Sequence, residues 1–277
     1  KSICNYFLQA ASIYILAYDK PLRHVVLDLN LFLLVLASSA TIAGGYIINN
    51  FYDSEKDLIN RPIKSRLDKL VSQNTKLSFY FVLNFAAVIM ASYVSFKPVI
   101  FFSIYIFGIW FYSHKLKKLP FIGNLTSAVL TITPFFAIFM YYKNFETVIF
   151  VHAIYLFLLI SMRELIKDLE NIKGDLTQNY HTIPVVYGEI VSKKMLTLLS
   201  LLTLIPAYLL LLKFEIGYMN LYFYLSIGFM FVFLLLLWKS KTKVHYLLLH
   251  NVLKFIIVLG VFSILLIDVN VVLNRLF

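Results

Sequence analysis

The stretch Tyr46-Ile-Ile-Asn-Asn-Phe-Tyr-Asp-Ser-Glu-Lys-Asp57 decides the fold, because in it an apolar run passes directly into a polar stripe. Asn49, Asp53 and Asp57 recur every four residues, so on a helix they share one face. The apolar run over residues 29–50 is long enough to cross a bilayer. Ionisable residues at a membrane span are costly and are usually retained for a function. The stretch therefore predicts a membrane helix that ends in a functional polar site.

A second stretch repeats this design farther along the chain. Arg163-Glu-Leu-Ile-Lys-Asp-Leu-Glu-Asn-Ile-Lys-Gly-Asp175 follows the apolar run 147–166, and its polar side chains again recur at helical spacing: Glu164, Asp168, Asn171 and Asp175. Asn49-x-x-x-Asp53 and Asn171-x-x-x-Asp175 have the same form. This similarity predicts a pseudo-repeat of two halves, about 1–119 and 120–277, within one domain.

The composition excludes an ordinary soluble domain. Of the 277 residues 61% are hydrophobic and 14% are charged, which leaves too little polar surface for a soluble protein of this size. Apolar runs separated by polar breaks predict a single all-α polytopic domain with nine transmembrane helices. The expected spans are 3–18, 29–50, 75–96, 98–113, 120–142, 147–166, 194–212, 218–238 and 246–272.

Lys and Arg are concentrated in alternate gaps between these spans. They follow the second, fourth, sixth and eighth spans, and by the positive-inside rule these gaps face the cytoplasm. Both polar stripes therefore open on the cytoplasmic side of an integral membrane protein. The net charge of +11 reflects this asymmetry, and with no nucleic-acid motif in the sequence we expect no nucleic-acid partner.

The residue types in the two stripes predict a magnesium site. Mg²⁺ prefers oxygen ligands and is typically held by one or two carboxylates together with substrate phosphates. Such oxygens are supplied by four residues of the stripes: Asn49, Asp53, Asn171 and Asp175. Soft-metal chemistry is not expected, because Cys4 is the single cysteine and no His pair has ligand spacing.

Basic residues in the same gaps suit a diphosphate. Arg61, Lys115 and Lys167 lie next to or within the stripes, although the positive-inside rule alone would also place cations there. An isoprenoid diphosphate combines an anionic head for this site with a hydrocarbon tail for the membrane. The sequence thus favours an enzyme that uses a prenyl diphosphate, with membrane lipid around it.

The motifs also resemble those of the UbiA superfamily of intramembrane prenyltransferases. Residues 46–62, which end in Asn60-Arg-Pro62, are similar to its first aspartate-rich motif, and residues 163–175 with the loop 182–188 are similar to its second. Tyr112 and Lys115 match a further family feature, which adds Tyr112 to the residues expected at the diphosphate. The form of the second motif is most similar to the branch that makes geranylgeranylglyceryl phosphate ethers.

The resemblance implies a helical bundle around a central cavity open to lipid. It also implies Mg²⁺-dependent ionisation of the donor, such as geranylgeranyl diphosphate, and prenyl transfer to a lipophilic acceptor, either a glyceryl phosphate ether lipid or an aromatic compound. The acids that it implies as catalytic residues are Asp53, Asp57, Asp168 and Asp175. Two positions depart from the family pattern, since Asn50 and Asn171 stand where Asp is usual. An amide oxygen can still bind Mg²⁺, but it adds no negative charge.

Two other functions fit the same pattern. A terpene cyclase of the same superfamily would ionise the diphosphate without an acceptor. A transporter would use intramembrane acids and an internal repeat as a substrate path, although the stripes lie at helix ends rather than near the midplane. A phosphotransferase acting on alcohols is less consistent, because its Asp-Gly and Ala-Arg lead-in is missing from both stripes.

Overall fold

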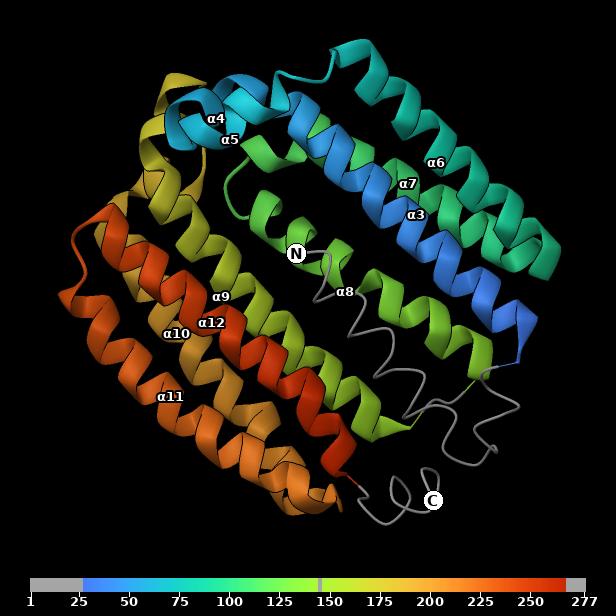
Figure 1. Cartoon of the computed structure of the whole chain (residues 1–277). Coiled ribbons are helices and arrows are strands. Elements are labelled where there is room, and N and C mark those ends of the chain that lie inside the picture. The colour runs from blue at the N-terminus through green and yellow to red at the C-terminus, as the bar shows by residue number, and fades with distance from the viewer. Residues whose placement is uncertain (1–26, 144–145, 268–277) are drawn as a thin grey trace.

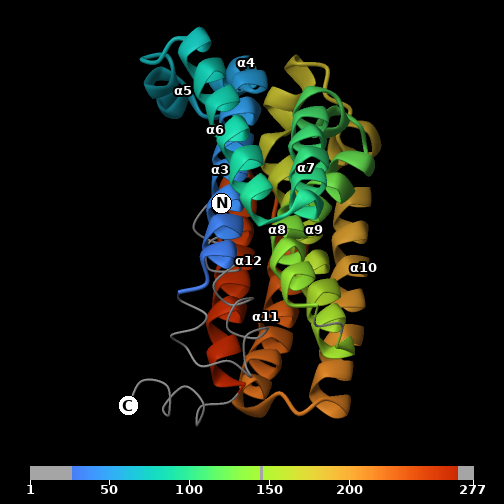
Figure 2. The same ribbon diagram turned by 90° about the vertical axis from the view of Figure 1, so that its right-hand side faces the viewer.

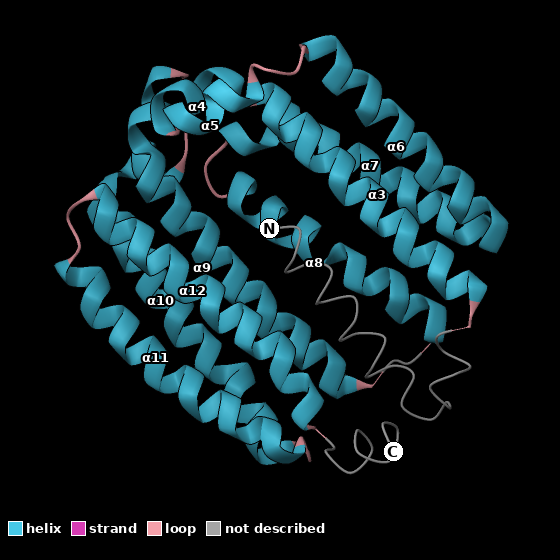
Figure 3. Ribbon diagram, viewed as in Figure 1, coloured by secondary structure: helices cyan, strands magenta, loops and turns pink. Residues whose placement is uncertain are grey.

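The computed structural model describes residues 27–143 and 146–267, and every regular element within these residues is a helix (Figure 3). The elements are α3 (Leu29–Tyr52), α4 (Ser54–Asn60), α5 (Pro62–Asp68), α6 (Gln73–Val94), α7 (Phe96–His114), η1 (Leu116–Lys118), α8 (Ile122–Tyr142), α9 (Thr147–Thr177), α10 (Ile183–Lys213), η2 (Gly217–Met219), α11 (Asn220–Lys239), α12 (Lys243–Ser263) and η3 (Ile264–Leu266).

The predicted all-helical membrane fold is confirmed. In the described ranges eight helices, α3 and α6 to α12, are long and apolar enough to cross a bilayer. They correspond to eight of the nine expected spans, and the remaining one, 3–18, lies outside the described residues. Large apolar side chains such as Phe85 and Tyr93 are exposed on their outer faces, as expected where lipid replaces water. The chain is an integral membrane protein.

The helices form two packed groups that meet at α8 and α9 (Figure 1). In one group α3 packs against α6, α7 and α8; in the other α9 packs against α10 and α12. Each group has its own buried apolar cluster, centred on Phe102 in the first and on residues such as Met162 and Phe233 in the second. Burial of these side chains away from lipid comes from close helix packing rather than from the hydrophobic effect.

Helix α9 is longer than a bilayer requires. Its 31 residues extend about 46 Å at 1.5 Å per residue, whereas the hydrocarbon core is about 30 Å thick. The last turns, which carry the second polar stripe, therefore extend toward the end of the bundle where α4 and α5 lie (Figure 2). The short helix α4 packs directly on α9, so the two stripes meet at this end.

Candidate active site between α4, η1 and α9

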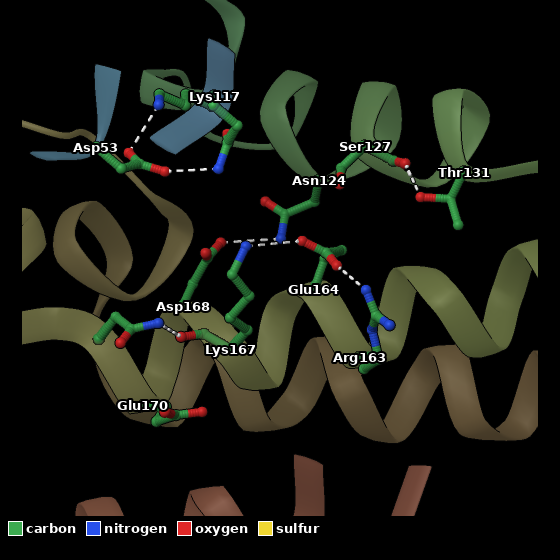
Figure 4. Close-up of polar contacts among 12 residues, drawn as sticks. Asp53, Lys117, Asn124, Ser127, Thr131, Arg163, Glu164, Lys167, Asp168 and Glu170 are labelled. Carbon is green, nitrogen blue, oxygen red and sulfur yellow. Dashed lines mark hydrogen bonds and ion pairs between the residues drawn. The ribbon is translucent and has the colours of Figure 1, made fainter. Parts of the chain in front are cut away.

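Asp53 lies at the junction of α3 and α4, and both of its carboxylate oxygens have partners (Figure 4). The Lys117 ammonium donates to Oδ1 at 2.7 Å, and the Asn49 amide donates to Oδ2 at 2.9 Å. The Tyr180 hydroxyl also donates to Oδ1, at 3.3 Å. Asp53 thus connects the first stripe to the η1 turn and to the loop after α9.

The charges around Asp53 shift its titration and that of its partners. Burial alone would raise the pKa of Asp53, but the positive charges of Lys117 and Lys56 outweigh burial and lower it. Burial lowers the pKa of Lys117 to about 8, although the Asp53 carboxylate opposes that shift. Burial and the same carboxylate raise the pKa of Tyr180. Asp53 is therefore ionised and Tyr180 is a neutral donor at neutral pH.

Asp175, in the last turns of α9, is fully buried and pairs with a lysine of the first stripe. The Lys56 ammonium forms an ion pair with its Oδ1, and the Thr182 hydroxyl donates to Oδ2 at 3.2 Å. The same ammonium lies 4.5 Å from the centre of the Tyr180 ring, a cation–π geometry. Through Lys56 and Tyr180 the two stripes are in electrostatic contact.

Gly174 allows the close approach of α4 to α9. A Cβ atom at this position would overlap the side-chain amide of Asn60 on α4. The same amide donates to the main-chain oxygen of Asn171 at 3.4 Å. The glycine before Asp175 is therefore a packing requirement of the site.

A second group of polar contacts lies farther along α9, beside α8. The Asn124 amide donates to Asp168 at 2.9 Å, and Lys167 donates to Glu164 at 3.2 Å. Figure 4 shows these three α9 side chains on the side of the helix that faces α8 and Asp53. Tyr112 of α7 is also close, since the charges of Lys167 and Asp168 both act on its hydroxyl.

The structure places most of the predicted site residues together and three of them apart. Those that meet at this end of the bundle are Asn49, Asp53, Tyr112, Lys167, Asp168, Asn171 and Asp175. Asp57 instead pairs with Lys64 at 3.0 Å, and that lysine also donates to Asn50. Arg61 lies 3.8 Å from Glu170, on the α12 side of α9. Lys115 is exposed where α7 ends.

Three residues at the centre of the site were not selected from the sequence: Lys56, Lys117 and Tyr180. Lys117 stands in a run with Lys115 and Lys118, and the sequence alone gives no reason to prefer the buried one. From the sequence alone, Lys56 is expected to be an exposed residue between two acids. Tyr180 follows the second stripe without any spacing that singles it out.

The oxygen atoms of the site fit a hard cation that shares its coordination with a substrate. Within residues 27–143 and 146–267 no three His, Cys, Asp or Glu side chains converge as a complete metal cage. The buried Asn171 Oδ1 has no hydrogen-bond partner in this part of the chain, so it is a free acceptor beside Asp175. A sparse set of this kind is what Mg²⁺ uses when phosphate oxygens and water complete its shell.

Comparisons with known proteins identify the family. The model of the UbiA prenyltransferase family matches residues 10–250. The digeranylgeranylglyceryl phosphate synthase of Thermococcus sibiricus is 36% identical over 166 residues, which cover 60% of this chain and 59% of that protein. The synthase of the same name from Thermococcus gammatolerans is 31% identical over 65% of this chain and 64% of that protein. The chain thus spans less than two thirds of the length of these relatives.

Solved structures show the same fold. A UbiA homologue from Aeropyrum pernix aligns with a TM-score of 0.72 at 14% identity, over 94% of this chain and 96% of that one. A UbiA homologue from Archaeoglobus fulgidus bound to GPP and Mg²⁺ aligns with a TM-score of 0.66 at 16% identity, over 95% and 96%. The resemblance that the two motifs indicate is confirmed, and this chain belongs to the UbiA prenyltransferase family.

Proposed function

We propose that this chain is an intramembrane prenyltransferase that ionises an isoprenoid diphosphate and transfers the prenyl group to a lipophilic acceptor. The observation that carries the proposal is the meeting of the two polar stripes, in which Lys56 of the first pairs with Asp175 of the second beside Asp53 and Tyr180. Membership of the family and the GPP-bound Archaeoglobus homologue support the donor class.

The donor diphosphate would bind where acids and lysines alternate. Mg²⁺ would be held by Asn49, Asp53, Asn171 and Asp175, and when bound it would supply positive charge to the diphosphate oxygens. Lys56 and Lys117 lie at the same carboxylates and can donate directly to phosphate oxygens. This arrangement neutralises an anion at the end of a membrane span.

The chain's own donors would assist departure of the diphosphate. As the bond between the allylic carbon and the diphosphate oxygen breaks, the electron pair leaves with the oxygen and negative charge develops there. Lys167 and the Tyr112 hydroxyl lie close to each other beside the donor site and can donate to the leaving group. Asp168 helps to position Lys167, since its charge acts on that lysine, while Asn124 holds Asp168 in place.

Two predicted residues lie at the edge of this donor site. Asp57 holds Lys64 against Asn50, and in the proposal this pair shapes the α4 wall of the donor site. Lys115, exposed beside η1, would attract the diphosphate toward the site without a fixed contact.

The acceptor would complete the reaction in the same cavity. A nucleophilic atom of the acceptor forms the new bond to the allylic carbon and releases its proton. The names of the curated relatives favour a glyceryl phosphate ether lipid as the acceptor class. Lys243, at the start of α12, donates to Asn60 at 2.9 Å, so another lysine-rich gap lies at the same end as the site. By the positive-inside rule, that end would face the cytoplasm.

Incubation of the protein in nanodiscs with Mg²⁺ and radiolabelled geranylgeranyl diphosphate tests the proposal, with and without geranylgeranylglyceryl phosphate. We expect a lipid-soluble product that depends on the acceptor, is lost in Asp53→Ala and is retained in Glu55→Ala. Glu55 is the matched control because it is an exposed acid on the same short helix. A product formed without an acceptor would indicate a cyclase, and full activity of a folded Asp53→Ala protein would refute the proposed donor site.

A further inference from the structure

A cluster of basic side chains lies on the α12 side of α9, away from the donor site. Glu170 is at its centre: His250 of α12 lies 3.0 Å from Glu170 Oε2, and Arg61 lies 3.8 Å from Oε1. The positive charges of Arg163 and Arg61 both act on the Lys254 ammonium. Figure 4 shows Glu170 on the other side of α9 from the Asp168 and Lys167 group. We call Arg61, Arg163, His250 and Lys254 the α12 cluster.

The α12 cluster has more positive charge than its acids can balance. Arg163 pairs with Glu164 at 2.5 Å, but Glu164 is shared with Lys167 of the donor site. Glu170 alone remains for the charges of Arg61 and Lys254, and its Oε2 already accepts from the His250 ring. Within membrane spans such an excess is costly unless an anion compensates it. The α12 cluster therefore has the charge of an anion-binding site.

One buried nitrogen atom of the α12 cluster also lacks an acceptor. Arg163 Nε has no hydrogen-bond partner among the described residues, and the side chain is about 5% exposed. A buried donor without a partner costs free energy that a ligand can recover. This observation is independent of the charge count and points to the same class of ligand.

The helix geometry separates the α12 cluster from the donor site. At about 100° per residue, Arg163 and Glu170 lie within about 20° of each other around α9, and Asp168 and Asp175 do the same. The two pairs are about 140° apart, with Lys167 between them. An anion at the α12 cluster would therefore lie beside the donor rather than in its place.

The ligand would reach the α12 cluster from the membrane. Lys254 and its neighbour Asn251 are exposed, although Lys254 lies 11 residues into α12, about 16 Å from the start of the helix.

We propose that the α12 cluster binds the phosphate of the acceptor, a lipid with a phosphomonoester head. This inference rests on the proposed prenyl transfer. The sequence position of Arg61, just after the first stripe, predicts that it binds the donor diphosphate. Its contact with Glu170 instead favours a role in binding the phosphate of the acceptor lipid.

Kinetics with two acceptors test the inference: geranylgeranylglyceryl phosphate and the same lipid without its phosphate, geranylgeranylglycerol. We expect the wild-type protein to prefer the phosphorylated acceptor. Lys254→Gln should raise KM for that acceptor about tenfold, because a charge-assisted contact is lost, and should leave KM for the donor unchanged. Lys254→Arg should keep the preference. Lys241→Gln is the control, since this exposed lysine lies just before α12.

The outcomes separate the inference from the proposed function. If the wild-type protein transfers the prenyl group to neither lipid, the proposed function fails. If it transfers to both and Lys254→Gln changes the two KM values equally, or changes neither, the inference is overturned. A resident phospholipid is tested by comparing phosphatidylcholine nanodiscs with phosphatidylglycerol nanodiscs. Suppose that activity depends on the nanodisc headgroup, that Lys254→Gln removes this dependence, and that the wild-type protein does not prefer either acceptor. The cluster would then bind bulk phospholipid, and the inference would be overturned.

Discussion

The two edges of the polar face of α9 differ in their balance of charge. Toward α8 and η1 the face presents Asp168 and Asp175 near Asp53, and lysines of other elements pair with two of these acids: Lys117 with Asp53, and Lys56 with Asp175. Toward α12 it presents one acid, Glu170, and the basic side chains of His250 and Arg61 from other elements lie around it. An acid-rich edge suits a metal ion that brings a diphosphate, whereas a cation-rich edge suits an anion without a metal. In our proposal, one helix would in this way distinguish two phosphorylated lipids.

The largest effect should come from removing one charge at the acid-rich edge. Asp53→Asn keeps the shape of the side chain but removes the charge that holds Lys117 and would bind Mg²⁺. We expect prenyl transfer to fall about a hundredfold or more, as when preorganised charge is lost at a reacting group. Initial rates at saturating donor and acceptor measure the change. Glu55→Gln should retain full activity, and an equal loss in that control would contradict the assignment.

Chelation of divalent metal ions should affect the two edges of α9 differently. EDTA should abolish turnover and Mg²⁺ should restore it, because the acids at the donor edge do not form a metal cage without phosphate oxygens. Binding of geranylgeranylglyceryl phosphate, followed as an increase in Tm, should persist in EDTA. Loss of both turnover and acceptor binding would show that the two edges do not act separately.

At the cation-rich edge the expected effect is on stability. Glu170→Gln removes the carboxylate that accepts from His250 and pairs with Arg61, and leaves the Arg61 charge uncompensated. We expect destabilisation of about 1–3 kcal/mol, typical of a buried polar group that loses its partner, seen as a lower Tm in detergent. The phosphorylated acceptor should raise Tm more in this variant than in the wild type. A variant as stable as the wild type would mean that Glu170 does not balance the α12 cluster.

A smaller structural change should affect the acid-rich edge alone. In Gly174→Ala the added Cβ would collide with Asn60 and push α4 away from α9. We expect a loss of about 1–3 kcal/mol, as for other overpacked sites, and a higher KM for the donor. Adding Asn60→Ala should restore part of the stability and lower KM for the donor again, because it removes the colliding amide. The preference for a phosphorylated acceptor should not change in either variant.

The smallest effect should come from Tyr180→Phe. This change removes the 3.3 Å hydrogen bond to Asp53 but keeps the ring beneath the Lys56 ammonium. We expect a severalfold loss of kcat/KM, consistent with one hydrogen bond of about 1 kcal/mol. Tyr180→Leu should cost more, because the cation–π contact is lost as well. Equal losses in the two variants would mean that the hydroxyl carries the whole effect.

The sequence predicts the helices well because span length and polar breaks are local properties. The break between α6 and α7 illustrates its limit, since the chain turns at Ser95 rather than at Lys97-Pro98. Helical spacing also predicts that Asn171 and Asp175 share a face with Asp168. It cannot predict which lysine reaches which acid. Lys117, rather than Lys115, meets Asp53 because the η1 turn buries it, and that depends on packing between distant segments.

Since both edges belong to one uninterrupted helix, the distance and angle between the two lipid head groups would be set by the helical register of α9. The residues of the two edges alternate along this helix, because Glu170 lies between Asp168 and Asp175. One residue inserted between Arg163 and Asp168 would therefore turn Arg163 by about 100° away from Glu170 and move it by about 1.5 Å, while Asp168 and Asp175 kept their alignment. The length of chain between Arg163 and Asp168 is in this sense as much a determinant of acceptor binding as the side chains themselves.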